Sequence, residues 1–150
     1  MWGVRNKSQS AMWSNYGVEP VTLDTGGNVY PETDPILTSS LVYENTSRLA
    51  SIGSAYFSLV NPWYHAPSIP EEVGYHLYSY ALDLISLDSQ GSTNFGKLTN
   101  VSLSFEPDTV SLEATALVHD NVTMAYETVI LSSNHNVVRI SGGALGFPVL

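Results

Sequence analysis

Metal binding and proton transfer are the first chemistry to consider, because the chain contains four histidines: His65, His76, His119 and His135. No two of them stand two or four positions apart, the spacing that directs two imidazoles toward one metal ion. His119 is followed by Asp120, but neighbouring residues of a strand point to opposite faces, and no nucleophile motif accompanies the pair. We therefore expect no metal site and interpret this pair as a polar turn.

Carboxylates offer a second kind of chemistry, since glycoside hydrolysis needs two of them beside the scissile bond. Three glutamates fall on expected strands, where a β-sandwich could present them: Glu44, Glu113 and Glu127. The chain has 14 acidic residues, so a few on strands are expected by chance. We therefore assign no catalytic residue and do not expect an enzyme.

Aromatic side chains at Trp63 and Tyr64, followed by His65, could stack on a sugar. Large aromatic residues near strand ends also fill a sandwich core or form a subunit contact. A carbohydrate-binding β-sandwich module is therefore the alternative function. Residues 142–146 are rich in glycine and resemble a phosphate-cradling turn, but the four residues after them are too few for the helix that would hold a phosphate. No cofactor is expected.

The composition narrows the class of protein further. The chain has 150 residues, of which 43% are hydrophobic, and a formal net charge of −9. This length and apolar content suit one domain, or part of a larger one, with a real core. The acidic balance argues against direct binding of nucleic acid, since such binding depends on clustered Lys and Arg. The few cations, Arg48 and Arg139 among them, are expected to pair with carboxylates.

Two further features exclude whole classes of structure. The chain contains no cysteine, which excludes a disulfide scaffold, a thiol catalyst and a zinc site with cysteine ligands. No apolar run approaches the roughly 18 residues that a membrane-spanning helix needs.

Short β-branched or aromatic segments separated by Gly, Pro, Asn, Asp and Ser are typical of an all-β sandwich or barrel. Strands are expected at residues 1–6, 41–44, 75–82, 101–105, 112–118, 125–131 and 137–140. Residues 101–105 alternate apolar and serine side chains, which predicts one buried and one exposed face. Residues 75–82 are apolar enough to be covered on both sides. We therefore predict an all-β fold, an antiparallel β-sandwich of jelly-roll type.

The remaining segments are expected to connect these strands. Residues 18–35 form a long loop, and residues 56–60 form a strand or a single helical turn that ends at Asn61-Pro62. Residues 132–136 form either a hairpin loop or a bend in one long strand. No helix of ten or more residues is expected. Gly91, Asn94 and Gly96 are expected to form a tight turn before Val101, so that Gly96→Val would lower the folded yield.

Five stretches of the chain, in order, resemble blocks of the major capsid protein of iridoviruses, a family of large eukaryotic DNA virus capsid proteins. They are residues 43–49, 56–64, 74–82, 91–100 and 134–150. The resemblance covers most of residues 41–150 and weakens in residues 106–124, and the last block resembles the family's carboxy terminus.

This resemblance implies a structural protein of an icosahedral virus shell, with two jelly rolls in tandem. Three such chains form a capsomer of pseudo-hexagonal outline, so the implied partners are copies of itself in a homotrimer, neighbouring capsomers and minor capsid proteins. The shell lies over an internal membrane, which implies proximity to that membrane. The implied location is the capsid of the virion, with assembly in the host cytoplasm.

Only the end of the family's chain is represented, so residues 1–150 are expected to be part of the second, carboxy-terminal jelly roll. Residues 1–6 then correspond to an interior strand, and the sandwich is expected to be incomplete at its N-terminal edge. An open sheet edge has unpaired amide and carbonyl groups that invite aggregation. We therefore expect a partial sequence that expresses poorly or associates nonspecifically.

Overall fold

Antiparallel strands make up most of the regular structure. The computed structural model describes residues 1–6, 14, 16–18, 33–109, 111–112, 118–119, 122–123 and 126–146. Its strands are β1 (Trp2–Asn6), β2 (Ile36–Tyr43), β3 (Thr46–Gly53), β4 (Val101–Pro107), β5 (Val118–His119), β6 (Val122–Thr123), β7 (Tyr126–Ile130), β8 (Arg139–Ser141) and β9 (Ala144–Gly146). Every strand pairing in this part of the chain is antiparallel, which confirms the expected all-β class.

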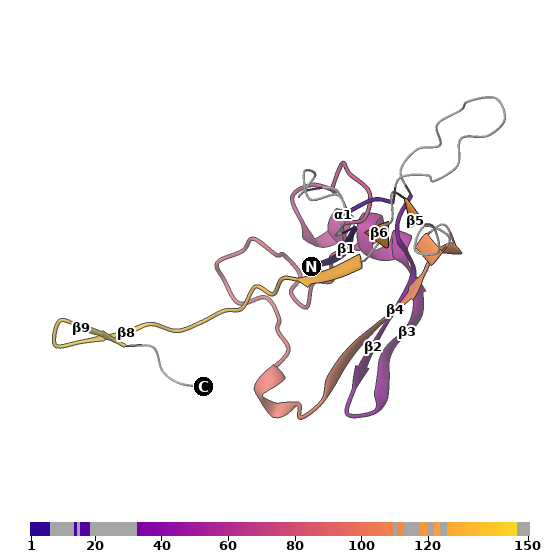
Figure 1. Cartoon of the computed structure of the whole chain (residues 1–150). Helices are drawn as coiled ribbons and strands as arrows, with labels where there is room; N and C mark the ends of the chain where they lie inside the picture. Colours follow the sequence, from indigo (N-terminus) through magenta and orange to yellow (C-terminus); the bar gives the residue numbers. More distant parts are fainter. Residues whose placement is uncertain are drawn as a thin grey trace.

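The largest sheet has the strand order β3-β2-β4, and β1-β7, β5-β6 and β8-β9 form two-stranded sheets. The three long strands lie side by side in Figure 1. A two-residue turn joins β2 to β3, with φ of 48° at Glu44 and 62° at Asn45. Positive φ at both turn residues matches the twist of a tight hairpin, and Asn tolerates this conformation better than most residues.

Strand β4 confirms the expected alternation in part. Leu103 and Phe105 are half-buried and Ser102 and Ser104 are exposed, but Val101, which was expected on the buried face, is 38% exposed. Strands β1 and β7 also form where the sequence predicts them. Strand β2 is longer than the predicted residues 41–44, and the sequence does not predict β3. Because most β3 side chains are exposed, the strand carries little hydrophobic pattern.

A helical segment follows β3, and the sequence prediction for it is only partly right. Residues 54–65 are continuously helical, and they include η1 (Tyr56–Val60), a π-helical turn, and α1 (Asn61–His65). The prediction that Asn61-Pro62 ends the helix is wrong, as is the prediction that no helix reaches ten residues. Asn61 has helical angles, and Pro62 lies in the first turn of α1, where a missing N–H costs little.

The predicted strand at residues 75–82 is also wrong. The expected burial holds for His76, Leu77 and Ser79 but not for Leu82, which is 72% exposed. The backbone groups of this segment bond to different partners, so no ladder forms. His76 exchanges two backbone hydrogen bonds with Trp2, and the N–H of Leu77 donates to the carbonyl of Phe57. An irregular segment thus occupies the place of a strand.

Predictions for the remaining segments have mixed outcomes. Residues 19–32 of the expected loop, residues 113–117 of an expected strand and residues 147–150 lie outside the described part of the chain. A bridge joins Val18 to Thr33. Residues 111–112 are helical rather than extended, and residues 132–136 are neither a hairpin loop nor part of a strand, because the β8-β9 turn lies at residues 142–143.

The turn before β4 is present as the 3-10 turn η2 (Phe95–Lys97). Gly91 has a φ of +125°, so its backbone does need glycine there. Gly96 has no left-handed φ, and a Cβ there would meet only Asn94 Oδ1 at 3.2 Å. The physical reason for expecting Gly96→Val to lower the folded yield therefore does not apply.

The core brings together the first strand, the large sheet and the helical segment. Trp2, Ile36 and Phe57 are its buried members, with exposed fractions of 8%, 2% and 1%. The rings of Trp2 and Phe57 meet edge to face with centroids 5.0 Å apart. Burial of a large apolar side chain contributes about 1.5–3 kcal/mol, so these three residues hold the separate sheets together.

A buried polar junction adjoins this core. His76, which is 1% exposed, stacks on Trp2 and donates from Nε2 to Asp34 Oδ2 over 2.8 Å. The Ser54 hydroxyl donates to the same carboxylate oxygen, and the N–H of Ile36 donates to the other over 2.9 Å. The junction therefore ties β1, the start of β2, the helical segment and residue 76 to one carboxylate.

The pKa of Asp34 decides how this junction responds to acid. Burial of the carboxyl group raises its pKa, but the hydrogen bonds from His76 and Ser54 outweigh burial and hold the pKa below its ordinary value of 3.8. A group whose pKa is lower in the folded state adds stability above its unfolded pKa, and this stability is lost as the pH falls through the folded pKa. The junction therefore weakens below about pH 4.

We predict that Asp34→Asn lowers the free energy of unfolding by about 2–3 kcal/mol at pH 7, because it leaves the buried His76 without its charged partner. The variant should also lose part of the acid sensitivity below pH 4. Urea denaturation followed by circular dichroism at pH 7 and pH 3 measures both effects. Glu106→Gln, at an exposed carboxylate, is the control and should change little. Equal effects of the two substitutions would contradict the assigned role of Asp34.

We predict a larger loss of stability for Gly74→Ala. Gly74 has a φ of +92°, and a Cβ there would lie 2.1 Å from the carbonyl oxygen of Tyr16. The clash and the backbone strain together should lower the free energy of unfolding by at least about 3 kcal/mol. Gly53→Ala is the matched control, since a Cβ at Gly53 meets nothing within 4 Å. Equal midpoints for the two variants in a urea titration would refute the prediction.

Candidate functional site

The expected carboxylate candidates do not form a pair. Glu44 lies in the β2-β3 turn, and its Oε1 accepts backbone hydrogen bonds from Thr99 and Asn100, the latter over 3.0 Å. Glu127 lies on β7 and forms an ion pair with Arg5 of β1 over 2.8 Å. The two residues belong to different sheets, and Glu113 lies outside the described residues. Both described carboxylates hold neighbouring segments in place.

The Asp34 junction has the residue types of a catalytic triad without its geometry. A triad requires the hydroxyl to donate to the imidazole, so that the imidazole can take its proton. Here the Ser54 hydroxyl donates to the carboxylate, and His76 Nδ1 is buried without a hydrogen-bond partner among the described residues. The junction therefore serves packing, and its serine is not activated as a nucleophile.

The structure describes only some of the histidines and arginines for which the sequence made predictions. His119 is in β5, but nothing is described of its side chain, and Asp120 lies outside the described residues. No group of three or more metal-ligating side chains occurs within the described ranges. The expected ion pairs of Arg48 and Arg139 are not found with any described partner, whereas Arg5 does form one. No helix in the described part of the chain is long and apolar enough to cross a membrane.

Exposed apolar side chains gather on the helical segment and form its outer surface. We call the following five residues the helix patch: Leu59, Val60, Trp63, Tyr64 and Ile85. Leu59 and Trp63 are four positions apart, as are Val60 and Tyr64, so the four side chains form two neighbouring rows on the helical segment. Trp63 and Tyr64 are 70% and 73% exposed. Aromatic residues are enriched at protein interfaces, and contiguous exposed apolar surface marks a contact site.

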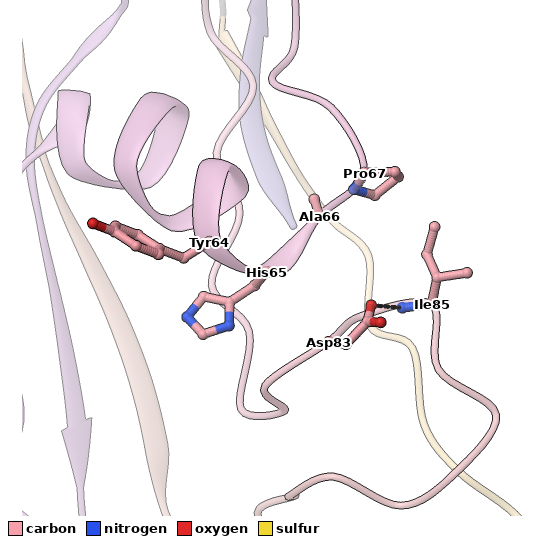
Figure 2. Close-up of a pocket in the computed structure, with 6 residues that line it drawn as sticks. All are labelled: Tyr64, His65, Ala66, Pro67, Asp83 and Ile85. Carbon is pink, nitrogen blue, oxygen red and sulfur yellow. Dashed lines mark hydrogen bonds between the residues drawn. The ribbon is translucent and has the colours of Figure 1, made fainter.

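Two open hollows adjoin the helix patch, with volumes of about 450 Å³ and 380 Å³. Figure 2 shows the first, lined by Tyr64, His65, Ala66, Pro67, Asp83 and Ile85. Trp63 and Ile69 line the second, together with Pro67. His65 Nδ1 donates to the carbonyl of Leu82 over 2.9 Å, and this bond fixes the 82–85 loop against the end of α1.

An aromatic cluster holds the segment that carries this loop against the large sheet. The hydroxyls of Tyr43 on β2 and Tyr80 are hydrogen-bonded, and the ring of Tyr80 packs edge to face on Tyr78 and Phe95 at 4.9 Å and 5.7 Å. Burial, followed by the bond to Tyr43, raises the pKa of Tyr80 well above its ordinary value. The Tyr80 phenol therefore stays protonated at neutral pH and acts as a packing group.

The sugar-stacking interpretation of Trp63, Tyr64 and His65 fits this surface poorly. All three lie on α1, and adjacent residues of a helix point about 100° apart, so their rings do not form a flat platform. His65 is engaged with Leu82. Exposed aromatic side chains that diverge in this way suit contact with another protein better than the binding of a sugar.

The sequence indicated a contact role for Trp63 and Tyr64, but it gave no such indication for Ile85, the loop residue of the helix patch. Leu82, Leu84, Ile85 and Leu87 are all exposed. The sequence does contain a signal for this surface, because apolar residues repeat between Ser and Asp in residues 82–88. This segment forms no strand. Residues 142–146, which resemble a phosphate-cradling turn in sequence, contain a hairpin turn instead. Gly142 and Gly143, with φ of 60° and 80°, form the turn between β8 and β9.

Comparison with known proteins places the chain in a family. A sequence model described as "Large eukaryotic DNA virus major capsid protein" matches residues 1–146. The chain is 50% identical to the major capsid protein of Invertebrate iridescent virus 3, over 99% of this chain and 34% of the relative. It is 43% identical to that of Frog virus 3, over 100% of this chain and 34% of the relative. The chain thus spans about a third of the length of these relatives.

Solved structures show the same fold. A quasi-atomic model of the PBCV-1 virus capsid aligns with 97% of this chain and 41% of its own, with a TM-score of 0.65 and 21% identity. The crystal structure of PBCV-1 VP54, fitted into a reconstruction of the virophage Sputnik, aligns with 75% of this chain and 30% of its own, with a TM-score of 0.55 and 25% identity. These similarities confirm the expected antiparallel β-sandwich of jelly-roll type. The chain belongs to the family of large eukaryotic DNA virus major capsid proteins and is similar to those of iridoviruses.

Proposed function

We propose that this chain is part of the second, carboxy-terminal jelly roll of a major capsid protein and builds an icosahedral virus shell. The family match over residues 1–146 supports the structural role. The resemblance of residues 134–150 to the family's carboxy terminus supports assignment to the second jelly roll. In this proposal the protein acts as a building block without catalysis, and the role requires no catalytic, cofactor or metal site.

The mechanism we propose is self-association through rigid, repeated surfaces. Three full-length chains form a capsomer of pseudo-hexagonal outline, and capsomers tile the shell. Closed rotational symmetry lets one sequence supply both sides of each contact. The observation that carries this proposal is the helix patch, where Trp63 and Tyr64 are 70% and 73% exposed beside two hollows. Burial of such aromatic residues dominates the energetics of many interfaces.

Partners and location follow from the same role. The partners are copies of the chain in a homotrimer, neighbouring capsomers and minor capsid proteins, in the capsid of the virion, with assembly in the host cytoplasm. The shell lies close to an internal viral membrane. Direct binding of nucleic acid is not part of this role, because the chain has a formal net charge of −9 and scattered cations.

A chimera tests the assembly directly. In the major capsid protein of Invertebrate iridescent virus 3, the aligned segment is replaced by this 150-residue chain, which is 50% identical to it. We expect the purified chimera to have the mass of three chains in multi-angle light scattering. A folded chimera that stays monomeric at all concentrations, while the unmodified relative is trimeric, would contradict the proposal.

The helix patch can be tested in the same chimera. We expect Trp63→Asp to weaken trimer formation about 30-fold or more, because a charge replaces an aromatic anchor of about 2 kcal/mol. Leu87→Asp is the matched control, since Leu87 is 98% exposed and lies outside the helix patch. Sedimentation velocity over a concentration series measures both. Equal association of the two variants would remove the helix patch from the interface.

A further inference from the structure

Hydrogen bonds join the helical segment to a stretch that follows it, and we call residues 54–65 together with residues 76–85 the helical unit. Three backbone N–H groups of the second stretch donate to the first, over 2.9–3.0 Å: Leu77 to the carbonyl of Phe57, Ser79 to Asn61 Oδ1 and Leu84 to the carbonyl of His65. No carboxylate takes part in these three bonds. Protonation of acidic groups therefore leaves them in place.

Two polar contacts tie the helical unit to strand β2, one near each end of the strand. Just before β2 begins, Ser54 and His76 both donate to Asp34 Oδ2. Where β2 ends, the hydroxyls of Tyr43 and Tyr80 are hydrogen-bonded. The strand between the two contacts has eight residues, which span roughly 25 Å at about 3.3 Å per residue. The two contacts therefore hold opposite ends of the helical unit.

The two contacts respond differently to acid. The first depends on a carboxylate, and protonation of Asp34 removes the anion that strengthens the bonds from Ser54 and His76. The second joins two neutral hydroxyls, and the raised pKa of Tyr80, caused first by burial, keeps its phenol protonated in acid. Acid therefore acts on one end of the helical unit and spares the other.

His76 depends on Asp34 as its counter-charge. Its imidazole is fully buried and lies 2.8 Å from this carboxylate, and the charge that lowers the pKa of Asp34 is that of His76 itself. His76 Nδ1 has no hydrogen-bond partner among the described residues. A positively charged His76 beside a protonated Asp34 would therefore be buried with neither a counter-charge nor an acceptor for its second N–H, which is costly.

The charged groups on the elements around the junction have other partners. On β1, β4 and α1 these pairs are Arg5 with Glu127, Glu106 with Thr38, and His65 with the carbonyl of Leu82, while the Met1 ammonium donates to the carbonyl of Leu131. Asp108 donates its N–H to the carbonyl of Pro35, but its charge does not shift the pKa of Asp34. Phenols such as those of Tyr56 and Tyr78 are neutral in acid. Asp34 and His76 therefore form the acid-sensitive pair.

We propose that acid loosens the helical unit at its Asp34 end only, while the contact between Tyr43 and Tyr80 holds the other end on β2. The peptide bond from Gly53 to Ser54 limits the movement, so the change is a local loosening around residues 54–60 and 76–77. The helical unit carries the helix patch, so the loosening alters how that surface is held. The inference goes beyond the proposed function and does not rest on it, because it concerns contacts inside one chain.

Hydrogen exchange followed by mass spectrometry in the full-length chimera tests this proposal at pH 6 and pH 3, with rates corrected for the intrinsic effect of pH. We expect the amides of residues 55–60 and 75–77 to lose protection about tenfold or more at pH 3, and those of residues 78–85 to lose less than about threefold. Equal loss of protection in both regions, or no loss in the first, would overturn the proposal.

Two variants of the chimera separate the two ends. Asp34→Asn should show at pH 6 the loosening that the unmodified chimera shows at pH 3, with little further change in acid. Tyr80→Phe is the matched control, because it removes a hydroxyl from the other contact. It should raise exchange in residues 78–85 at both pH values and leave the acid response of residues 55–60 unchanged. An Asp34→Asn variant that keeps the full acid response would contradict the assigned role of this carboxylate.

Ser54→Ala is a milder change that keeps the proposal testable where Asp34→Asn does not fold. The Ser54 hydroxyl lowers the pKa of Asp34, so its removal should raise that pKa and move the midpoint of the acid loosening to higher pH by about half a unit or more. A midpoint that stays in place or moves to lower pH would refute this. A chimera that stays monomeric still reports the protection of each region, so failure of the proposed function and failure of this inference are distinguishable.

Discussion

The stacking of His76 on Trp2, together with the hydrogen bond from His76 Nε2 to Asp34, is the contact on which the rest of the structure depends. Four segments distant in sequence meet there: β1, the start of β2, the helical segment and the irregular stretch at residue 76. Individually these pieces are a two-stranded sheet, a three-stranded sheet and a short helical segment, none of which encloses a core. A buried histidine held by a carboxylate joins them, and few apolar side chains of the described residues are buried there.

The junction also determines what the surface presents. Phe57 faces inward to Trp2, and this fixes the rotation of the helical segment so that Trp63 and Tyr64 face outward. The bond from His65 to Leu82 then adds the 82–85 loop to the same surface. A shell protein needs contact surfaces that keep one shape in every copy, and here the core sets that shape. The polar junction therefore fixes the orientation of this surface.

The sequence predicted those parts of the fold in which one side chain pattern dominates. Strand β4 alternates Leu103 and Phe105 with serines, and β1 and β7 are apolar enough to be recognised. It failed where tertiary contacts override local preference. Residues 75–82 look like a strand, but their backbone partners lie on separate segments, and the helix runs through Asn61-Pro62 because proline is tolerated in a first turn. The sequence indicated Trp63 and Tyr64 of the helix patch but not Ile85, because the fold brings Ile85 beside them from a separate loop.

The central claim is that the helix patch is a contact between copies of this chain in a shell. A cryo-EM reconstruction of particles assembled from the chimeric major capsid protein, at a resolution that shows side chains, tests it most directly. We expect Trp63 and Tyr64 to be buried against a neighbouring copy in every capsomer. Density that shows both rings facing solvent, or facing the interior of their own subunit, would contradict it.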